Sequence, residues 1–302
     1  MNPVRTSPLP RSFLYVPGDR PDLIAKARAG RADALVLDLE DAVSASGKRR
    51  ARSIVGDALR SRDEGTDGGT DGGRQRAGSS LPELWVRVDS AALGADLEAV
   101  TCRQLDGVFL AKCEPDSLDE AGRVLTDLES RRGIAGGSVG IVGLLETAAA
   151  VTRILTMAEH PRLRTFGIGE VDLLADLRMR RGPRSAAALD SLRGRVVLDC
   201  AAAGCEPPVA PTSTDFRDLG AFSESSRTML DLGFRSRTAI HPSQIPTIHD
   251  VFTPTSEELV AAHDIIDRLG DATGGVTVDA EGRLIDAAVI RSARETLGRA
   301  DR

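Results

Sequence analysis

Short apolar runs alternate with helix-like stretches along most of this 302-residue chain. The alternation predicts strands joined by helices, and therefore a parallel sheet. About eight such units over about 240 residues favour a closed (β/α)8 barrel over an open doubly wound sheet. No Gly-x-Gly-x-x-Gly follows the first run, so the dinucleotide-binding fingerprint is missing. The expected strands are 13–16, 34–39, 84–88, 107–111, 139–145, 165–168, 208–210 and 238–240, and the helices between them include 48–62, 117–132, 147–159, 191–203 and 219–232.

Two segments fall outside this pattern. Residues 62–80 contain a Thr-Asp-Gly-Gly duplication and no large apolar side chain, so we expect a disordered insertion there. Residues 251–302 follow the eighth run and predict a C-terminal extension with two helices and a short extended piece. The expected organisation is thus a barrel over residues 1–250 and an extension that packs on a neighbouring subunit.

Composition and charge exclude several classes of protein. The 39 basic and 45 acidic side chains give a formal charge of −6, whereas nucleic-acid binding needs a basic surface. No apolar run is long enough to cross a membrane, and the first ten residues lack the apolar core of a secretion signal. The four cysteines include no Cys-x-x-Cys pair, which disfavours a zinc site. We therefore expect a cytoplasmic protein without nucleic-acid or membrane partners.

Acidic side chains follow several of the expected strands, where the active site of a (β/α)8 barrel lies. Carboxylates that converge on one rim repel one another unless a cation or protons neutralise them. Mg²⁺ suits such a rim because it needs only one or two carboxylates besides water and substrate oxygens. Glu146 and Asp172 follow adjacent strands and are the natural ligand pair.

Two cations interrupt this acidic rim. Arg87 lies inside an apolar strand, where an unpaired charge is costly. It either pairs with Asp38 or Glu40 or binds a substrate carboxylate through its two-pronged guanidinium, and the sequence leaves both open. Lys112 could form a Schiff base, but an acidic rim would raise its pKa, which favours an ion pair instead. These four side chains, Asp38, Glu40, Arg87 and Lys112, form the expected substrate-binding set.

Several segments occur in an order and spacing that resemble a known family. They are RSFLYVPGDRP (11–21), ADALVLDLEDAV (32–43), VRV (86–88), LAK (110–112), LLET (144–147), GEVDLLADL (169–177) and AIHPSQI (239–245). Together they resemble the citrate lyase beta-subunit-like group of the aldolase superfamily, which includes malyl-CoA lyase relatives and acts on short acids and their CoA thioesters. The resemblance implies a (β/α)8 barrel, a magnesium ion and a homotrimer or homohexamer.

The resemblance also implies roles for individual residues. Glu146 and Asp172 match the metal ligands, and Arg87 matches the arginine that binds the substrate carboxylate. Arg20 and Lys26 resemble a pair that binds CoA phosphates. Asp286 occupies a position similar to that of an aspartate that enters the neighbouring subunit's site as the catalytic acid or base.

Five positions depart from the family pattern and put its usual substrate in question, the first being Ala111, where proline is usual. Val171 separates two acidic residues that are normally adjacent, and Asp89 stands where asparagine is usual. Ala210 stands near the place of a common aspartate, and Ala288 replaces an expected proline.

The favoured function is a magnesium-dependent carbon–carbon lyase acting on malyl-CoA, citramalyl-CoA or citryl-CoA, with a 2-oxo acid as the other product. A true citrate lyase subunit is disfavoured because no docking surface for an acyl carrier is evident. A pyruvate-type class II aldolase would carry a histidine where Asp41 stands. A barrel that binds an acyl-CoA or organic acid without turnover is the remaining alternative.

Overall fold

The computed structural model describes residues 8–61, 81–271, 277–278 and 284–300. The insertion expected to be disordered, residues 62–80, lies outside the described residues. The chain divides into two units, Met1–Ile248 and His249–Arg302. No helix among the described residues is long and apolar enough to span a membrane.

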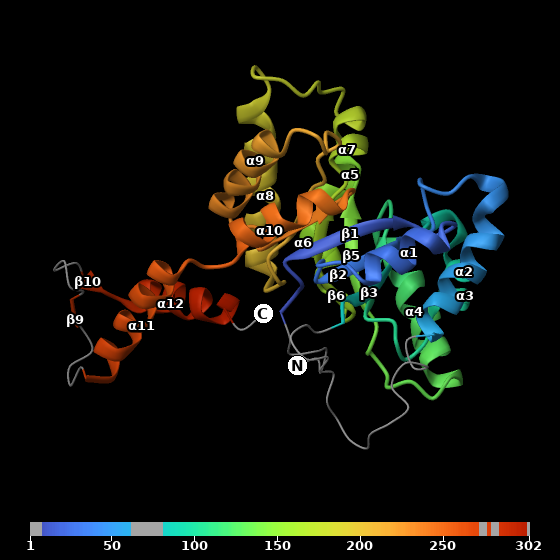
Figure 1. Ribbon diagram of the computed structural model, residues 1–302, viewed down its shortest axis with the longest axis horizontal. Helices are drawn as coiled ribbons and strands as arrows, with labels where there is room; N and C mark the ends of the chain where they lie inside the picture. Colours follow the sequence, from blue (N-terminus) through green and yellow to red (C-terminus); the bar gives the residue numbers. More distant parts are fainter. Residues whose placement is uncertain (1–7, 62–80, 272–276, 279–283, 301–302) are drawn as a thin grey trace. The chain divides into compact units, whose positions relative to one another are not determined.

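Eight parallel strands close into a barrel in the first unit, with each strand next to its sequence neighbours and β1 next to β8 (Figure 1). The expectation of a (β/α)8 barrel is therefore confirmed. The strands are β1 (Ser12–Pro17), β2 (Ala34–Asp38), β3 (Glu83–Val88), β4 (Gly107–Leu110), β5 (Gly140–Leu145), β6 (Leu163–Ile168), β7 (Val209–Ala210) and β8 (Ser236–Ala239).

Helices connect the strands and cover the outside of the barrel (Figure 1). They are α1 (Pro21–Arg28), α2 (Lys48–Arg60), α3 (Leu93–Val100), α4 (Pro115–Arg131), α5 (Ala148–Thr152), α6 (Ile154–Met157), α7 (Glu170–Asp176), α8 (Ala186–Ala203) and α9 (Leu219–Leu232), followed by α10 (Ile245–Phe252). Short 3₁₀ turns occur at η1 (Ala45–Gly47), η2 (Ser90–Ala92) and η3 (Pro242–Gln244).

Aromatic side chains fill the interior of the barrel. Phe13, Trp85 and Phe109 meet edge to face with ring centroids 5.2 to 5.7 Å apart, and all three are fully buried. Gly107 makes room for the indole, since a Cβ there would lie 2.3 Å from a ring carbon of Trp85. Because aromatic pairs add packing energy to a large buried area, this cluster forms a rigid floor beneath the strand ends.

Strand register places the acidic and basic side chains at one level. Asp38 at the end of β2 is aligned with Pro17 on β1 and with Arg87 on β3. Arg87 is in turn aligned with Phe109 on β4. Residues that are far apart in the chain therefore meet at the carboxyl end of the barrel.

Two local expectations were wrong. The helix expected over 117–132 starts earlier, because α4 begins at Pro115 with Glu114 as its N-cap and Ser117 in the reciprocal capping position. Proline at the first helical position makes this earlier start favourable. The helix expected over 147–159 divides into α5 and α6, because Arg153 (φ −110°, ψ 10°) leaves the helical conformation.

The second unit contains a helical hairpin. α11 (Ser256–Asp271) packs against α12 (Ala287–Ala300), and the short strands β9 (Thr277–Val278) and β10 (Leu284–Ile285) pair in antiparallel fashion. The extension is thus helical, as expected.

Candidate active site

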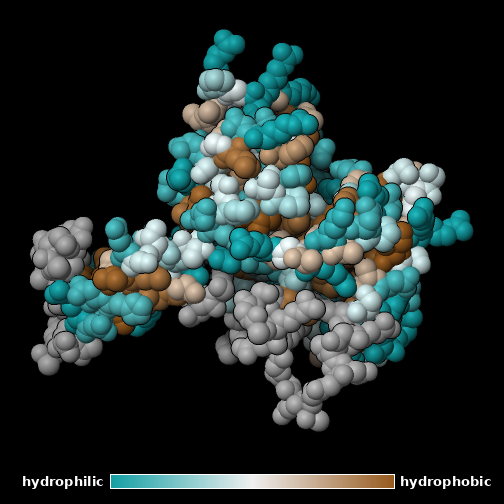
Figure 2. All heavy atoms as spheres, in the orientation of Figure 1, coloured by the Kyte–Doolittle hydropathy of each residue, from teal (hydrophilic) through white to brown (hydrophobic). Residues whose placement is uncertain are grey.

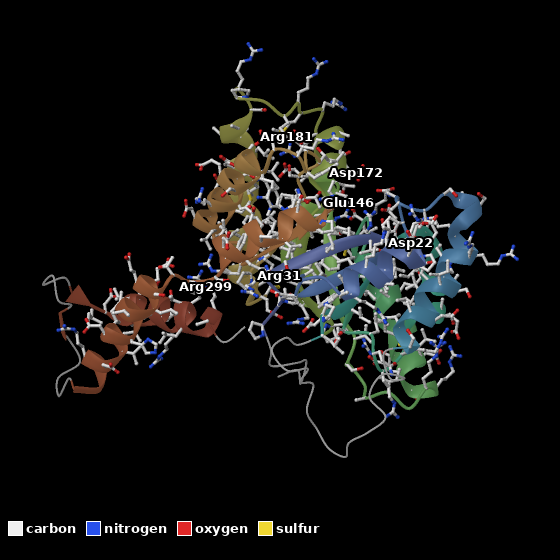
Figure 3. The ribbon with its side chains drawn as sticks, viewed as in Figure 1. Asp22, Arg31, Glu146, Asp172, Arg181 and Arg299 are labelled. Carbon is white, nitrogen blue, oxygen red and sulfur yellow. The ribbon has the colours of Figure 1, made fainter. Side chains whose placement is uncertain are left out.

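A cavity of about 500 Å³ opens at the carboxyl ends of the strands. Its walls include Tyr15, Asp38, Arg87, Phe109, Glu146 and Asp172, which come from β1 to β4, from the residue after β5 and from the first turn of α7. The structure therefore brings four of the predicted site residues, Asp38, Arg87, Glu146 and Asp172, to one cavity, and Glu40 and Lys112 are not part of its wall. Figure 3 labels Glu146 and Asp172 at this end of the barrel.

Arg87 is held by carboxylates from the preceding strand end. Its Nε and Nη2 atoms donate to the two oxygens of Asp38 at 2.7 and 2.6 Å, and Nη1 lies 2.9 Å from Glu40 Oε2. Burial alone would lower the pKa of Arg87, but the Asp38 carboxylate raises it above its usual value. Of the two roles left open by the sequence, the ion pair is present in the structure.

Lys112 links two acidic residues of the rim. Its Nζ lies 2.6 Å from Glu40 Oε1, and its backbone N–H donates to Glu146 Oε2 at 3.0 Å. The residue adopts a left-handed backbone (φ 47°), which is uncommon for a residue other than glycine and turns the N–H toward Glu146. The hydrogen bond to Glu40 raises the pKa of Lys112, so its amine stays protonated and is a poor nucleophile.

Glu146 is a buried carboxylate with few groups around it that would stabilise its negative charge. Its side chain is 4% exposed, and the hydrogen bond from Lys112 is its single one within the described part of the chain. Burial raises the pKa of Glu146 to about 7, and the negative charges of Glu40 and Asp172 add to the effect. Gly169 leaves room for the Glu146 side chain, since a Cβ at residue 169 would lie 2.3 Å from Glu146 Cγ.

This donor set fits a magnesium ion. A hard divalent cation would neutralise the Glu146 charge that burial and like charges destabilise, and Asp172 is the second oxygen donor on the same cavity. The described residues hold no group of three or more histidine, cysteine, aspartate or glutamate side chains that could form a metal cage. Two carboxylates suit Mg²⁺, which keeps several waters, better than zinc or calcium.

Glu170 and Asp172 have different environments at the start of α7. Glu170 is buried and receives two hydrogen bonds from Arg193, both 2.9 Å long, together with an ion pair from Arg181. Asp172 is exposed and faces the cavity. The intervening Val171 is 59% exposed and also lines the cavity. The displaced acid of the family pattern is therefore a structural ion-pair partner here.

The predicted phosphate-binding pair lies on the exposed surface of α1 and its N-cap. Arg20 donates to both oxygens of Asp22 at 3.0 and 2.9 Å, so its charge is already compensated. Lys26 is exposed. Neither side chain is part of the cavity wall.

Asp286 caps the N-terminus of α12 in the second unit. Its Oδ1 accepts from the backbone N–H groups of Ala288 and Val289 at 2.8 and 2.9 Å. These bonds lower the pKa of Asp286, because they favour the ionised carboxylate. Alanine at 288 supplies an N–H that the proline usual in the family would lack.

Sequence reasoning missed Tyr15. Its ring packs on the Arg87 guanidinium at 5.1 Å and meets Phe109 at 6.2 Å, and burial raises the pKa of its hydroxyl, which stays neutral. It lines the cavity as the chain's single tyrosine. A single tyrosine in a strand that leads to the rim is the sequence feature that could have identified Tyr15 as a site residue.

The other departures have structural explanations. Asp89 caps η2 by accepting from the backbone N–H of Ala91 and lies 3.5 Å from Lys48 Nζ. Ala210 is buried in the cavity wall, where an aspartate would add one more negative charge to an acidic site. His241 has a structural role, since it caps η3 and stacks on Phe216.

Fold and site together define an enzyme-type (β/α)8 barrel with a carboxylate pair and an arginine around one cavity. A family model, HpcH/HpaI aldolase/citrate lyase, matches residues 11–242. The chain belongs to this family.

Particular relatives cover nearly the whole chain. The chain is 30% identical to the citrate lyase subunit beta of Escherichia coli K12 over 96% of its length and 93% of the relative. It is 29% identical to a (3S)-malyl-CoA thioesterase of Cereibacter sphaeroides, over 96% and 94%. A solved citrate lyase beta subunit from M. tuberculosis, complexed with oxaloacetate and magnesium, is 26% identical with a TM-score of 0.61, over 81% of this chain and 97% of that one.

Proposed function

We propose that this protein is a magnesium-dependent carbon–carbon lyase for the CoA thioester of a small hydroxy acid, with a 2-oxo acid as the second product. The observation that carries the proposal is the buried Glu146 carboxylate, which shares one cavity with Asp172 and Arg87. The names of the relatives support the substrate class, since they include malyl-CoA and, in the solved structure, oxaloacetate with magnesium.

Glu146 and Asp172 would hold the metal ion. Bound Mg²⁺ supplies a Lewis acid that polarises the oxygen at the carbon where the bond breaks. Lys112 keeps Glu146 in place through its backbone N–H and pairs with Glu40 through its amine, so the Glu40 charge is already neutralised. The protein thereby reserves one buried carboxylate for the cation.

Arg87 would bind the carboxylate of the 2-oxo acid. Nε and Nη2 are occupied by Asp38, whereas Nη1 contacts Glu40 and Asp41, so a substrate carboxylate in the cavity would bind at Nη1 in place of these contacts. Asp38 fixes the plane of the guanidinium, and the Tyr15 ring covers one of its faces. Such pre-orientation lowers the entropy cost of binding the substrate.

Cleavage requires two proton movements. The substrate hydroxyl loses its proton as the carbon–carbon bond breaks, and the thioester enolate that forms takes up a proton at carbon. We assign the acid and base role to Asp286 of a neighbouring subunit, which makes a homotrimer or homohexamer part of the proposal. A cytoplasmic location agrees with a CoA thioester as substrate.

The test is to incubate the protein with Mg²⁺ and malyl-, citramalyl- or citryl-CoA and to measure the 2-oxo acid. We expect activity that EDTA abolishes and that Glu146→Gln and Asp172→Asn lower at least a hundredfold, since each removes a metal ligand. The matched control is Glu114→Gln, a rim carboxylate that pairs with Thr147 and Arg153 instead. Activity that persists in EDTA and in Glu146→Gln would refute the metal site.

Thioester hydrolysis is a second candidate, favoured by the 29% identity to a malyl-CoA thioesterase. The two reactions give different products. Hydrolysis of malyl-CoA releases free CoA thiol and malate, whereas carbon–carbon cleavage releases glyoxylate and keeps the thioester intact. Measuring thiol and 2-oxo acid in one sample therefore separates the two.

A further inference from the structure

Glu170 is a buried carboxylate that the proposed mechanism does not use, and it lies two residues before Asp172. Its side chain is 1% exposed and receives two hydrogen bonds of 2.9 Å from Arg193, one at each oxygen. Arg181 adds an ion pair at Oε1. Both carboxylate oxygens are therefore engaged by arginines, and the protein itself neutralises the charge of Glu170.

The buried face of α8 places Arg193 for this contact. Leu189, Arg193, Val196 and Cys200 recur at helical spacing and are all buried. A charged side chain on such a face is costly unless a partner neutralises it. Glu170 is that partner, so the ion pair joins the first turn of α7 to α8.

The first turn of α7 needs such a contact to fix its position. The helix has seven residues, whereas isolated helices shorter than about 12 residues are marginal in water. Its N-cap, Gly169, makes no side-chain hydrogen bond to the free N–H groups. At the other end of the helix, Asp176 accepts from the backbone N–H of Ala148. The Glu170 ion pair is thus the polar anchor of the turn that carries Asp172.

The same turn contacts Glu146, the other proposed metal ligand. The N–H of Gly169 donates to the backbone oxygen of Leu145 at 3.0 Å. A Cβ on Gly169 would lie 2.3 Å from Glu146 Cγ, so the glycine backbone packs directly on that side chain. A displacement of the turn would therefore move Asp172 and also change the space that Glu146 occupies.

Arg181 reaches Glu170 from the surface. It belongs to the connection between α7 and α8, over which Figure 2 shows hydrophilic side chains projecting (compare Figure 1). Figure 3 labels Arg181, Asp172 and Glu146 at one end of the barrel. The Arg181 side chain is 54% exposed, whereas that of Arg193 is 10% exposed. Because water screens an exposed ion pair, Arg193 contributes more to holding Glu170.

We propose that Glu170 and Arg193 are positioning residues for the metal site, which hold the first turn of α7 so that Asp172 and Glu146 can bind one ion. The inference rests on the metal role that the proposed function gives to these two carboxylates. It makes the metal affinity of this chain depend on an ion pair in which neither member is a ligand.

Arg193→Met tests the proposal, with the Kd of Mn²⁺ measured by electron paramagnetic resonance. The variant removes the anchor and leaves Glu170 with the exposed Arg181 alone, so we expect the Kd to rise about tenfold, as on loss of an outer support of a metal site. A purely electrostatic role predicts the reverse, because a less neutralised Glu170 adds negative charge near the ion. Equal or tighter Mn²⁺ binding would overturn the proposal.

The matched control is Arg162→Met, at the opposite end of the same strand. Arg162 precedes β6 and donates to both oxygens of the buried Glu129 at 3.0 and 2.6 Å, so this is a second buried pair of the same kind. We expect a lower Tm in both variants and weaker Mn²⁺ binding in Arg193→Met alone. An equal rise of the Kd in both would assign the effect to general loss of stability and overturn the proposal.

Glu170→Asp provides the test if Arg193→Met does not fold. Aspartate keeps the charge but is shorter by one methylene, so it reaches Arg193 only if the turn moves. We expect weaker Mn²⁺ binding, by a smaller factor than in Arg193→Met, and an unchanged Kd in the control Glu129→Asp. Wild-type affinity in Glu170→Asp would count against the positioning role.

The outcomes separate this inference from the proposed function. If the wild type binds Mn²⁺ and cleaves the thioester, but Arg193→Met binds Mn²⁺ as tightly, the positioning role is overturned and the function stands. If the wild type binds Mn²⁺ and cleaves no thioester, while Arg193→Met binds the ion more weakly, the function is overturned and the positioning role stands.

Discussion

Substituting Glu146 with glutamine should remove the loss of stability that the ionised, buried carboxylate causes in the wild type at neutral and alkaline pH. The folded pKa of Glu146, about 7, lies above the ordinary glutamate pKa of 4.5. Between these values the folded protein binds more protons than the unfolded chain, so its stability falls as pH rises. Glutamine has the same shape, can accept the Lys112 hydrogen bond and does not ionise, so the variant lacks this dependence.

The size of the effect follows from the shift of the pKa. A pKa raised from 4.5 to about 7 corresponds to a loss of stability of about 3 kcal/mol at high pH. Because part of the unfolded-state ionisation is already complete at pH 5, the change between pH 5 and pH 8 is about 2 kcal/mol. We expect the variant to gain this much stability relative to the wild type over that range.

Urea unfolding of both proteins in EDTA at pH 5 and pH 8 measures this difference. Adding Mg²⁺ at pH 8 should then stabilise the wild type but not the variant, because a ligand that binds the folded state alone raises its stability. Glu114→Gln serves as the control and should respond to Mg²⁺ like the wild type. A stability difference between Glu146→Gln and the wild type that is equal at both pH values would refute the burial argument.

Three further substitutions have defined outcomes. Arg87→Met should destabilise the protein by about 3 kcal/mol in urea unfolding, because it leaves the buried Asp38 charge unpaired, and a loss below 1 kcal/mol would contradict this. Gly169→Ala should raise the Mg²⁺ concentration needed for half-maximal activity, since the new methyl would lie 2.3 Å from Glu146 Cγ; an unchanged metal titration would argue against Glu146 as a ligand. Tyr15→Leu should raise KM more than Tyr15→Phe, which keeps the ring on the Arg87 guanidinium, and equal effects of both would assign the role to the hydroxyl.

Much of the architecture could be predicted from the chain alone. Apolar runs such as residues 34–39 and 107–111 are buried strands because a parallel sheet covered by helices buries both faces of each strand. Since the residues after parallel strands meet at one edge, Asp38, Glu146 and Asp172 could be placed at a common rim before any contact was known. That part of the site depends on the order and direction of the strands, and local sequence patterns predict both.

The pairing within that rim was decided by tertiary structure. The sequence left Arg87 between an ion pair and a ligand contact, and the register of β2 against β3 places it opposite Asp38. Nothing local predicted that Tyr15 would cover its guanidinium or that Glu170 would bind Arg193. These contacts join residues that are distant in the sequence.

The boundaries of helices also show which features the sequence predicts and which depend on the structure. The α4 start was misplaced because two overlapping capping patterns occur near Pro115, and local preference alone does not choose between them. The sequence by itself determined the strand order and the chemical groups at the strand ends, because both follow from local periodicity. Which of those groups neutralise one another and which remain free for a ligand depends on distances across the barrel, and only packing of the complete structure sets those distances.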